Sequence, residues 1–321
     1  FPLQQGAPSR PVPGGAVSVR DTAETVQFAA AGATLTLDRA TGLIRSYTRG
    51  GRMLLQGGAP NFWRAETDNA LGTGAARQLA IWKELSASRQ LSGVTLRTGA
   101  EGAREAVVEF ALGTEAVPRA ASFRTTYRMA GDGSVDVATQ FVPLKTDLPA
   151  PFRVGVAFDL PGELAEAEWY GRGPHESYVD RKHSAAIGLW RGRLADQPHD
   201  YIRPQDTGNK VDVRWMRLIG GGRGVRVEGA GPLMMNALPF AYTELYRRGP
   251  GTWKWTDIAF GRQGTLLVDA TQWGIGGDNQ WSDLGRPLPQ YRTRLEPVAF
   301  RFRLTPTNGA RSTGMLPGGN D

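Results

Sequence analysis

Residues 33–48 read ATLTLDRATGLIRSYT, and this stretch shows the pattern that recurs along the whole chain. Leu35 and Leu37 alternate with threonines, the segment Ala40-Thr41-Gly42 has the composition of a turn, and the alternation then resumes. A side-chain period of two is typical of a strand with one buried face. The stretch therefore predicts two antiparallel strands joined by a tight turn.

Short runs of the same kind follow one another along the sequence. Each is bounded by Gly, Pro or Asp, which commonly end strands. They cover 106–112, 134–142, 224–229, 265–270 and 298–304, with a further hairpin over 127–136 around Gly131-Asp132-Gly133. Residues 75–85 are the best candidate for the 3.6-residue period of a helix. The pattern predicts an all-β protein built as a large antiparallel β-sandwich.

Composition limits the class of protein. The 321 residues allow one large domain or two ordinary ones, and the 42 glycines and 21 prolines suit a chain with many turns. No apolar run approaches the roughly 18 residues of a membrane-spanning helix, so no membrane partner is expected. The absence of cysteine excludes disulfides but does not choose between a bacterial cytoplasm and periplasm. The net charge of +7 is spread out, so we expect no nucleic-acid partner.

A second stretch, residues 169–218, concentrates polar and aromatic groups: WYGRGPHESYVDRKHSAAIGLWRGRLADQPHDYIRPQDTGNKVDVRWMRL. It contains all three histidines of the chain, His175, His183 and His199. Their spacing matches neither HExxH nor a zinc finger, so we assign no metal site. Glu176 in the same stretch would need burial and a close partner to act as an acid.

Three separated segments resemble the C-terminal domain of large bacterial β-galactosidases, the LacZ-type members of glycoside hydrolase family 2. YGRGPHESYVDRK with YIRPQDTGNKVDVRW carries the first match, NFWRAETDNALG (61–72) the second and QWGIGGDNQWSD (272–283) the third, all in the family's order. Glu66 stands where the family has Pro, and Ala70 where it has Asp. The region 242–256 lacks an expected histidine. The chain is therefore identified as one piece of an enzyme.

The resemblance implies a galactose mutarotase-like supersandwich over residues 21–308, after a linker or domain remnant over 1–20 and before a polar tail over 309–321. The parent enzyme, expected to be a homo-oligomer, would hydrolyse terminal β-D-galactosyl residues with retention. Its two catalytic glutamates would lie on a (β/α)₈ barrel in another domain of the same protein. Because this chain has no barrel pattern, we assign it no catalytic residue and no cofactor, and expect it to be inactive alone.

The strongest binding signal is GIGGDNQWSD, residues 274–283. Glycines permit tight turns, and Asp278 and Asn279 offer polar groups beside Trp281. An indole suits a galactoside because the apolar C–H face of a pyranose packs on an aromatic ring. In the family, the matching Trp reaches the active-site mouth. We therefore assign substrate binding to Trp281, Asp278 and Asn279. The alternative is a Trp that only anchors its loop.

Other polar and aromatic side chains are expected to be structural. The remaining eight tryptophans are expected in the core or at an interface. The segments 64–69 and 172–181 are dense in hydrogen-bonding groups, which are costly to bury unpaired. We expect them to form a network that shapes the loops facing the barrel, with Glu176 paired to Arg181 or Lys182.

Two alternative functions stay open. A stand-alone aldose 1-epimerase would use two histidines and a carboxylate as acid and base, which His175, His199 and Glu176 could supply. A non-catalytic carbohydrate-binding module would need only the loop around Trp281.

Overall fold

The computed structural model describes residues 15–99, 102–246 and 253–309. Each run expected to be a strand lies in one to within a residue, and Ala33–Asp38 (β3) and Ile44–Arg49 (β4) form the hairpin expected over 33–48. The other strands are β1 (Ser18–Asp21), β2 (Thr25–Ala30), β5 (Arg52–Asn61), β6 (Gln90–Thr98), β7 (Arg104–Leu112), β8 (Ala121–Met129), β9 (Val135–Pro143), β10 (Arg153–Pro161), β11 (Glu166–Gly173), β12 (Ala186–Arg193), β13 (Lys210–Gly220), β14 (Arg223–Leu238), β15 (Gln263–Gln272) and β16 (Val298–Asn308).

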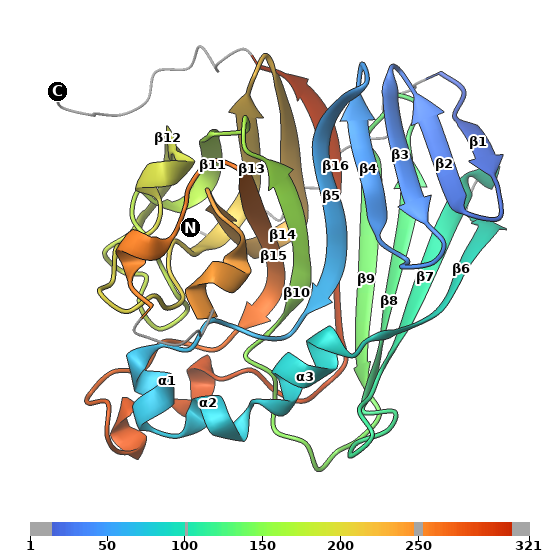
Figure 1. Ribbon diagram of the computed structural model, residues 1–321. Helices are drawn as coiled ribbons and strands as arrows, with labels where there is room; N and C mark the ends of the chain where they lie inside the picture. Colours follow the sequence, from blue (N-terminus) through green and yellow to red (C-terminus); the bar gives the residue numbers. More distant parts are fainter. Residues whose placement is uncertain (1–14, 100–101, 247–252, 310–321) are drawn as a thin grey trace, which may run out of the picture.

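These strands form one antiparallel sheet, which curls so that β6–β9 lie behind β1–β5 (Figure 1). The hydrogen-bonded order is β1-β2-β3-β4-β5-β10-β15-β14-β16-β9-β8-β7-β6, and β13, β11 and β12 continue from the long strand β14. Every neighbouring pair whose register is described is antiparallel, as short connections between successive strands allow. The expected all-β antiparallel sandwich is confirmed.

The main core lies between the two layers of the curled sheet. Leu35 and Leu37 of β3 are fully buried in it, as their alternation predicted. Four aromatic rings, Phe62, Trp82, Phe123 and Phe141, pack with centroids 5.1–5.8 Å apart. Removal of this apolar surface from water is the main force that holds the layers together.

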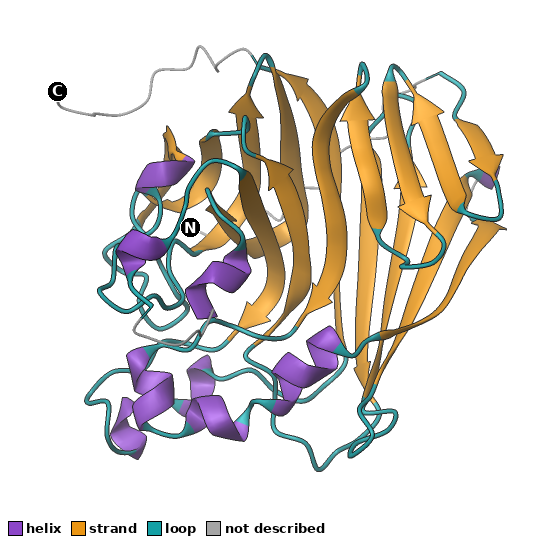
Figure 2. Cartoon of the chain, viewed as in Figure 1, coloured by secondary structure: helices purple, strands orange, loops and turns teal. Residues whose placement is uncertain are grey.

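Helices and loops gather at one end of the sheet (Figure 2). The helices are α1 (Asp68–Gly72), α2 (Ala75–Gln78) and α3 (Ile81–Ala87), with 3-10 turns η2 (Leu194–Asp196), η3 (Tyr242–Tyr246), η4 (Trp255–Asp257), η5 (Asp283–Gly285) and η6 (Pro289–Tyr291). The helix expected over 75–85 is thus broken between α2 and α3. The break sends Leu79 into a small cluster with Trp63, while Trp82 enters the main core.

Parts of the expected domain limits lie outside the described residues. Of the segment expected to be a linker, residues 1–14 are outside, whereas β1 begins at Ser18 and pairs with β2. The expected tail over 309–321 is outside from residue 310 onward, as are residues 247–252 within the divergent region 242–256. The domain limits therefore stay a prediction. Within the described ranges, no helix is both long and apolar enough to cross a membrane.

Candidate functional site

The segment after β15, residues 273–286, forms a loop that we call the Trp281 loop. Its base is anchored by Trp273, whose backbone N–H donates to the Phe152 carbonyl at 2.7 Å and whose ring packs edge-on against Phe152. Gly276 and Gly277 then have φ angles of +76° and +147°, a region that favours glycine. The expectation that the glycines allow a sharp turn is confirmed at these two positions.

The tip of the loop is folded on itself by Asn279. Its Oδ1 accepts hydrogen bonds from the backbone N–H groups of Trp281 at 3.1 Å and Ser282 at 2.9 Å. Its Nδ2 donates to the Ser282 hydroxyl, and Ser282 caps the 3-10 turn η5 by accepting from Leu284 N–H. Asn279 therefore builds the turn that carries Trp281, as Asx side chains do in many loops.

Trp281 is held at the tip with its side chain in solvent. The residue is 77% exposed, and Leu284 beside it is 65% exposed. The indole is therefore not packed in the core of the domain, and its role in binding stays a prediction. Asp278 is exposed on the same tip, and its backbone N–H donates to the Leu284 carbonyl.

Side chains from the other two family-like segments hold the first residues of the loop. Arg64, almost fully buried, donates to the carbonyls of residues 273 and 274 at 2.6 and 3.2 Å. Asn69 donates to the carbonyl of residue 275 at 3.2 Å. The Asp180 carboxylate accepts from the N–H groups of residues 275 and 276 at 2.9 and 2.8 Å. The three segments that were separated in sequence thus meet at the base of the Trp281 loop.

Helices α1 and α2 and the residues that follow them also contact the later part of the loop. Gly72 at the end of α1 packs so tightly against the Gln280 carbonyl that any β-carbon there would collide with it. Arg286 donates to the Thr73 carbonyl at 2.9 Å and to the Gln78 side chain at 2.7 Å. Because the loop is held near both of its ends, the exposed tip has a defined direction.

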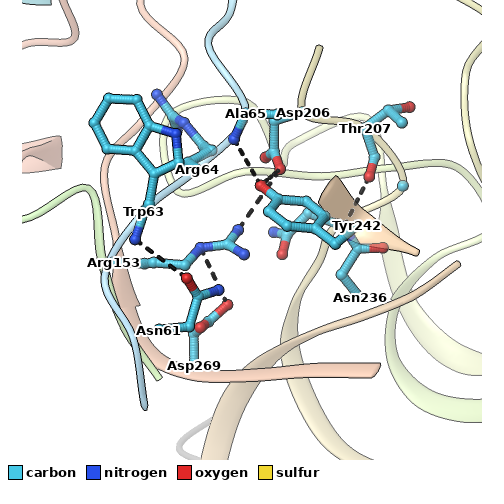
Figure 3. Close-up of polar contacts among 12 residues, drawn as sticks. Asn61, Trp63, Arg64, Ala65, Arg153, Asp206, Thr207, Asn236, Tyr242 and Asp269 are labelled. Atoms are coloured by element: carbon cyan, nitrogen blue, oxygen red, sulfur yellow. Dashed lines mark hydrogen bonds and ion pairs between the residues drawn. The ribbon is translucent and has the colours of Figure 1, made fainter. Parts of the chain in front are cut away.

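A buried ionic network lies next to the segment that contains Arg64 (Figure 3). Arg153 of β10 and Asp269 of β15 are both 0% exposed, and Asp206 is 2% exposed. Arg153 lies 3.7 Å from each carboxylate. The Tyr242 hydroxyl donates to Asp206 at 2.6 Å and accepts from the Ala65 N–H at 2.8 Å, which ties the network to the segment containing Arg64.

Burial changes the proton affinity of groups in this region. Removal from water raises the pKa of Asp269 to about 7, although the neighbouring Arg153 opposes the shift. Burial also lowers the pKa of Lys210 to about 8, opposed by the charge of Glu176. Arg153 and Asp269 were not predicted from the sequence. The sequence feature that could have indicated them is a charged residue within each of the apolar strand patterns FRVGVAF and TLLVDA.

Glu176 does not pair as expected. Instead of Arg181 or Lys182, its carboxylate accepts from the Tyr201 hydroxyl at 2.7 Å, the Thr207 hydroxyl at 3.1 Å and the Gly208 N–H at 2.8 Å. The sequence could not give these partners, because they lie 25–32 residues away along the chain. The expectation that Glu176 fixes a loop holds, but its partners were wrong.

The three histidines lie at the surface of the same region. All are exposed, and His175 contacts the Ser184 hydroxyl at 3.0 Å. In the described residues, no group of three or more His, Asp or Glu side chains is placed to hold a metal ion. Glu176 accepts three hydrogen bonds, and the rings of His175 and His199 are not among these partners.

The sequence of this chain is similar to β-galactosidases over most of its length. A family model described as the beta galactosidase small chain matches residues 29–304. The β-galactosidase of Priestia megaterium is 31% identical over 295 residues, which are 89% of this chain and 27% of that protein. Beta-galactosidase BgaC of Bifidobacterium adolescentis is 32% identical over 249 residues, which are 76% of this chain and 23% of that protein. The chain spans about a quarter of the length of these relatives.

Solved structures give a weaker likeness. The GalM/aldose epimerase homologue from C. elegans has a TM-score of 0.46 and 9% identity, with 91% of this chain and 99% of that chain covered. The galactose 1-epimerase from Lactobacillus acidophilus has a TM-score of 0.41 and 10% identity, with 92% and 99% covered. Both identities are far below those of the β-galactosidase relatives.

Proposed function

The chain belongs to the β-galactosidase small-chain family, and from this premise we propose that it is the C-terminal domain of a β-galactosidase that hydrolyses terminal β-D-galactosyl residues with retention. Retention requires two carboxyl groups about 5–5.5 Å apart. We place that pair on a barrel domain elsewhere in the enzyme, since relatives are more than three times as long as this chain. The role of this domain is to complete the mouth of the active site.

The observation that carries this proposal is the exposed Trp281 on a loop that is held near both of its ends. An indole fixed in one direction binds a sugar ring with little loss of conformational entropy, because the loop is ordered before binding. The exposed Asp278 carboxylate provides an acceptor for a sugar hydroxyl. Asn279 contributes to binding by holding the backbone of Trp281.

The same exposed surface suits contact with the rest of the enzyme. Leu71 of α1 joins Trp281 and Leu284 among the exposed large apolar residues, and α1 lies against η5. Apolar groups of this size on a protein surface commonly mark an interface. We propose the catalytic barrel as the partner, within a homo-oligomeric parent enzyme.

The proposal is tested by Trp281→Ala in the intact enzyme. Loss of one stacking face should weaken galactoside binding by about 1–3 kcal/mol, a rise in KM of roughly 5- to 150-fold. The matched control is Leu144→Ala, an exposed apolar residue on another loop, which should leave KM unchanged. A lower melting temperature with unchanged KM for Trp281→Ala would instead show an anchoring role.

A second measurement tests whether this domain is inactive without the rest of the enzyme. The purified 321-residue chain should not hydrolyse an aryl β-galactoside, because the proposed carboxyl pair lies elsewhere. Turnover at about 1–10³ per second, typical of enzymes, would contradict the proposal once host enzyme is excluded.

A further inference from the structure

We propose that Asp180 is a positioning residue that sets the direction of Trp281, and so controls galactoside affinity through the loop rather than by contact with the sugar. The positioning of the loop by Asp180 follows from the geometry alone, whereas the effect on galactoside affinity rests on the proposed function of Trp281.

The first support is the rigid mounting of Asp180. Tyr178 and Arg181 exchange both of their backbone hydrogen bonds, at 3.0 and 2.9 Å, so Val179 and Asp180 occupy the centre of a tight turn. The Tyr178 side chain is almost fully buried beneath this turn. A carboxylate mounted in this way has little freedom to follow a loop that moves.

The second support is the close approach of the loop backbone. Any β-carbon at Gly274 would collide with the Asp180 carboxylate, whereas glycine lets the carboxylate reach the N–H groups of Ile275 and Gly276. The first glycine of the GIGG segment is therefore required by contact with Asp180 and has no positive φ angle of its own to explain it.

The third support is the electrostatic pattern across one peptide group. The carbonyl of residue 274 accepts from the buried Arg64 cation, while the N–H of residue 275 in the same peptide unit donates to the Asp180 anion. Hydrogen bonds to charged groups are roughly twice as strong as neutral ones. Opposite charges at the two ends of this peptide dipole fix its plane, and the plane sets the path of the chain toward Trp281.

The first test uses this chain and hydrogen exchange. Asp180→Asn keeps the size of the side chain but removes its charge and one acceptor oxygen. Backbone N–H groups of residues 275–284 should exchange about tenfold faster or more, because charge-assisted bonds are lost. Exchange in β10 and β15 should not change. Asp147→Asn, an exposed loop carboxylate, is the matched control and should behave as wild type.

The second test uses the intact enzyme and a double-mutant cycle. Asp180→Asn should raise KM toward the value of Trp281→Ala, and adding Asp180→Asn to Trp281→Ala should raise it no further. Asp180→Glu, which keeps the charge but shifts it by one methylene, should give an intermediate KM, and it replaces the Asn variant if that variant does not fold.

The outcomes separate the two proposals. Unchanged exchange in Asp180→Asn, or KM effects of Asp180→Asn and Trp281→Ala that multiply in the double variant, would overturn the positioning role. Faster exchange together with an unchanged KM in Trp281→Ala would retain Asp180 as the residue that orders the loop, and would refute the sugar-binding function of Trp281 instead.

Discussion

The buried ionic network and the Trp281 loop lie near each other, yet they expose opposite kinds of side chain to water. Arg153 and Asp269 are charged groups removed from water, whereas Trp281 is an apolar ring left in it. The first arrangement costs stability unless the charges compensate each other, and the second costs little in the isolated chain. The network therefore serves the internal structure of the chain, whereas we propose that the loop serves a surface outside it.

Arg153→Met should have the largest effect on stability. It leaves Asp206 and Asp269 buried without their shared cation, which should lower the free energy of unfolding by about 3–5 kcal/mol. Urea denaturation followed by far-UV circular dichroism measures this. Arg124→Met, on an exposed salt bridge of β8, is the control and should cost at most about 1 kcal/mol. Equal losses in the two variants would remove the energetic contrast between buried and exposed charge.

Lys210 should make the buried region sensitive to pH. Its pKa is lowered from 10.5 to about 8 in the folded chain, so unfolding takes up a proton between these values. Stability therefore rises as the pH rises from 8 to 10.5, and the same gain is lost as the pH falls from 10.5 back to 8, below which Lys210 is protonated in both states. Relative to Lys210→Met, the wild type should gain ~3 kcal/mol across this window, from about 1.4 kcal/mol for each pKa unit. A pH-independent difference between the two proteins would contradict this assignment.

Asn279→Ala should have a smaller effect that is confined to the loop. The variant removes the acceptor for two backbone N–H groups, which should cost about 1 kcal/mol or less in global stability, since hydrogen bonds near solvent are partly replaced by water. Proteolytic cleavage near Trp281 should become faster, and the intact enzyme should show a higher KM. Unchanged cleavage would mean that the tip does not depend on Asn279.

Trp281→Ala should have the smallest effect on the fold. A side chain that is 77% exposed leaves no cavity, so the free energy of unfolding should change by less than about 0.5 kcal/mol. Calorimetry of the isolated chain measures this value beside Trp82→Ala, a fully buried tryptophan that should lose about 3–5 kcal/mol. Similar losses of unfolding free energy in both variants would mean that the Trp281 side chain packs in the core.

Local patterns predicted the strands well because burial on one face of a sheet leaves a period of two in the sequence. The β3–β4 hairpin follows from Leu35, Leu37 and a Gly-containing turn alone. The broken helix over 75–85 was harder, because Leu79 and Trp82 enter different clusters that no local period reveals.

The candidate site likewise combines features that are local in the sequence with contacts between distant segments. Trp281 was predicted from its glycine-rich polar loop, a local property of the sequence, together with the family resemblance, and its binding role stays a prediction. The partners of Glu176 and the positions of Arg153 and Asp269 depend on segments more than 20 residues apart.

By itself, the sequence determined the all-β class, the family and the loop that displays Trp281, since each of these depends on residues close together or on short motifs in a fixed order. Only the tertiary structure decided that Asp180 and Arg64 hold that loop and that Arg153 is buried between two aspartates. The physical reason is that hydrogen bonds and ion pairs between distant segments form only where the curled sheet brings strand ends together, and that closure leaves no periodic pattern in the chain.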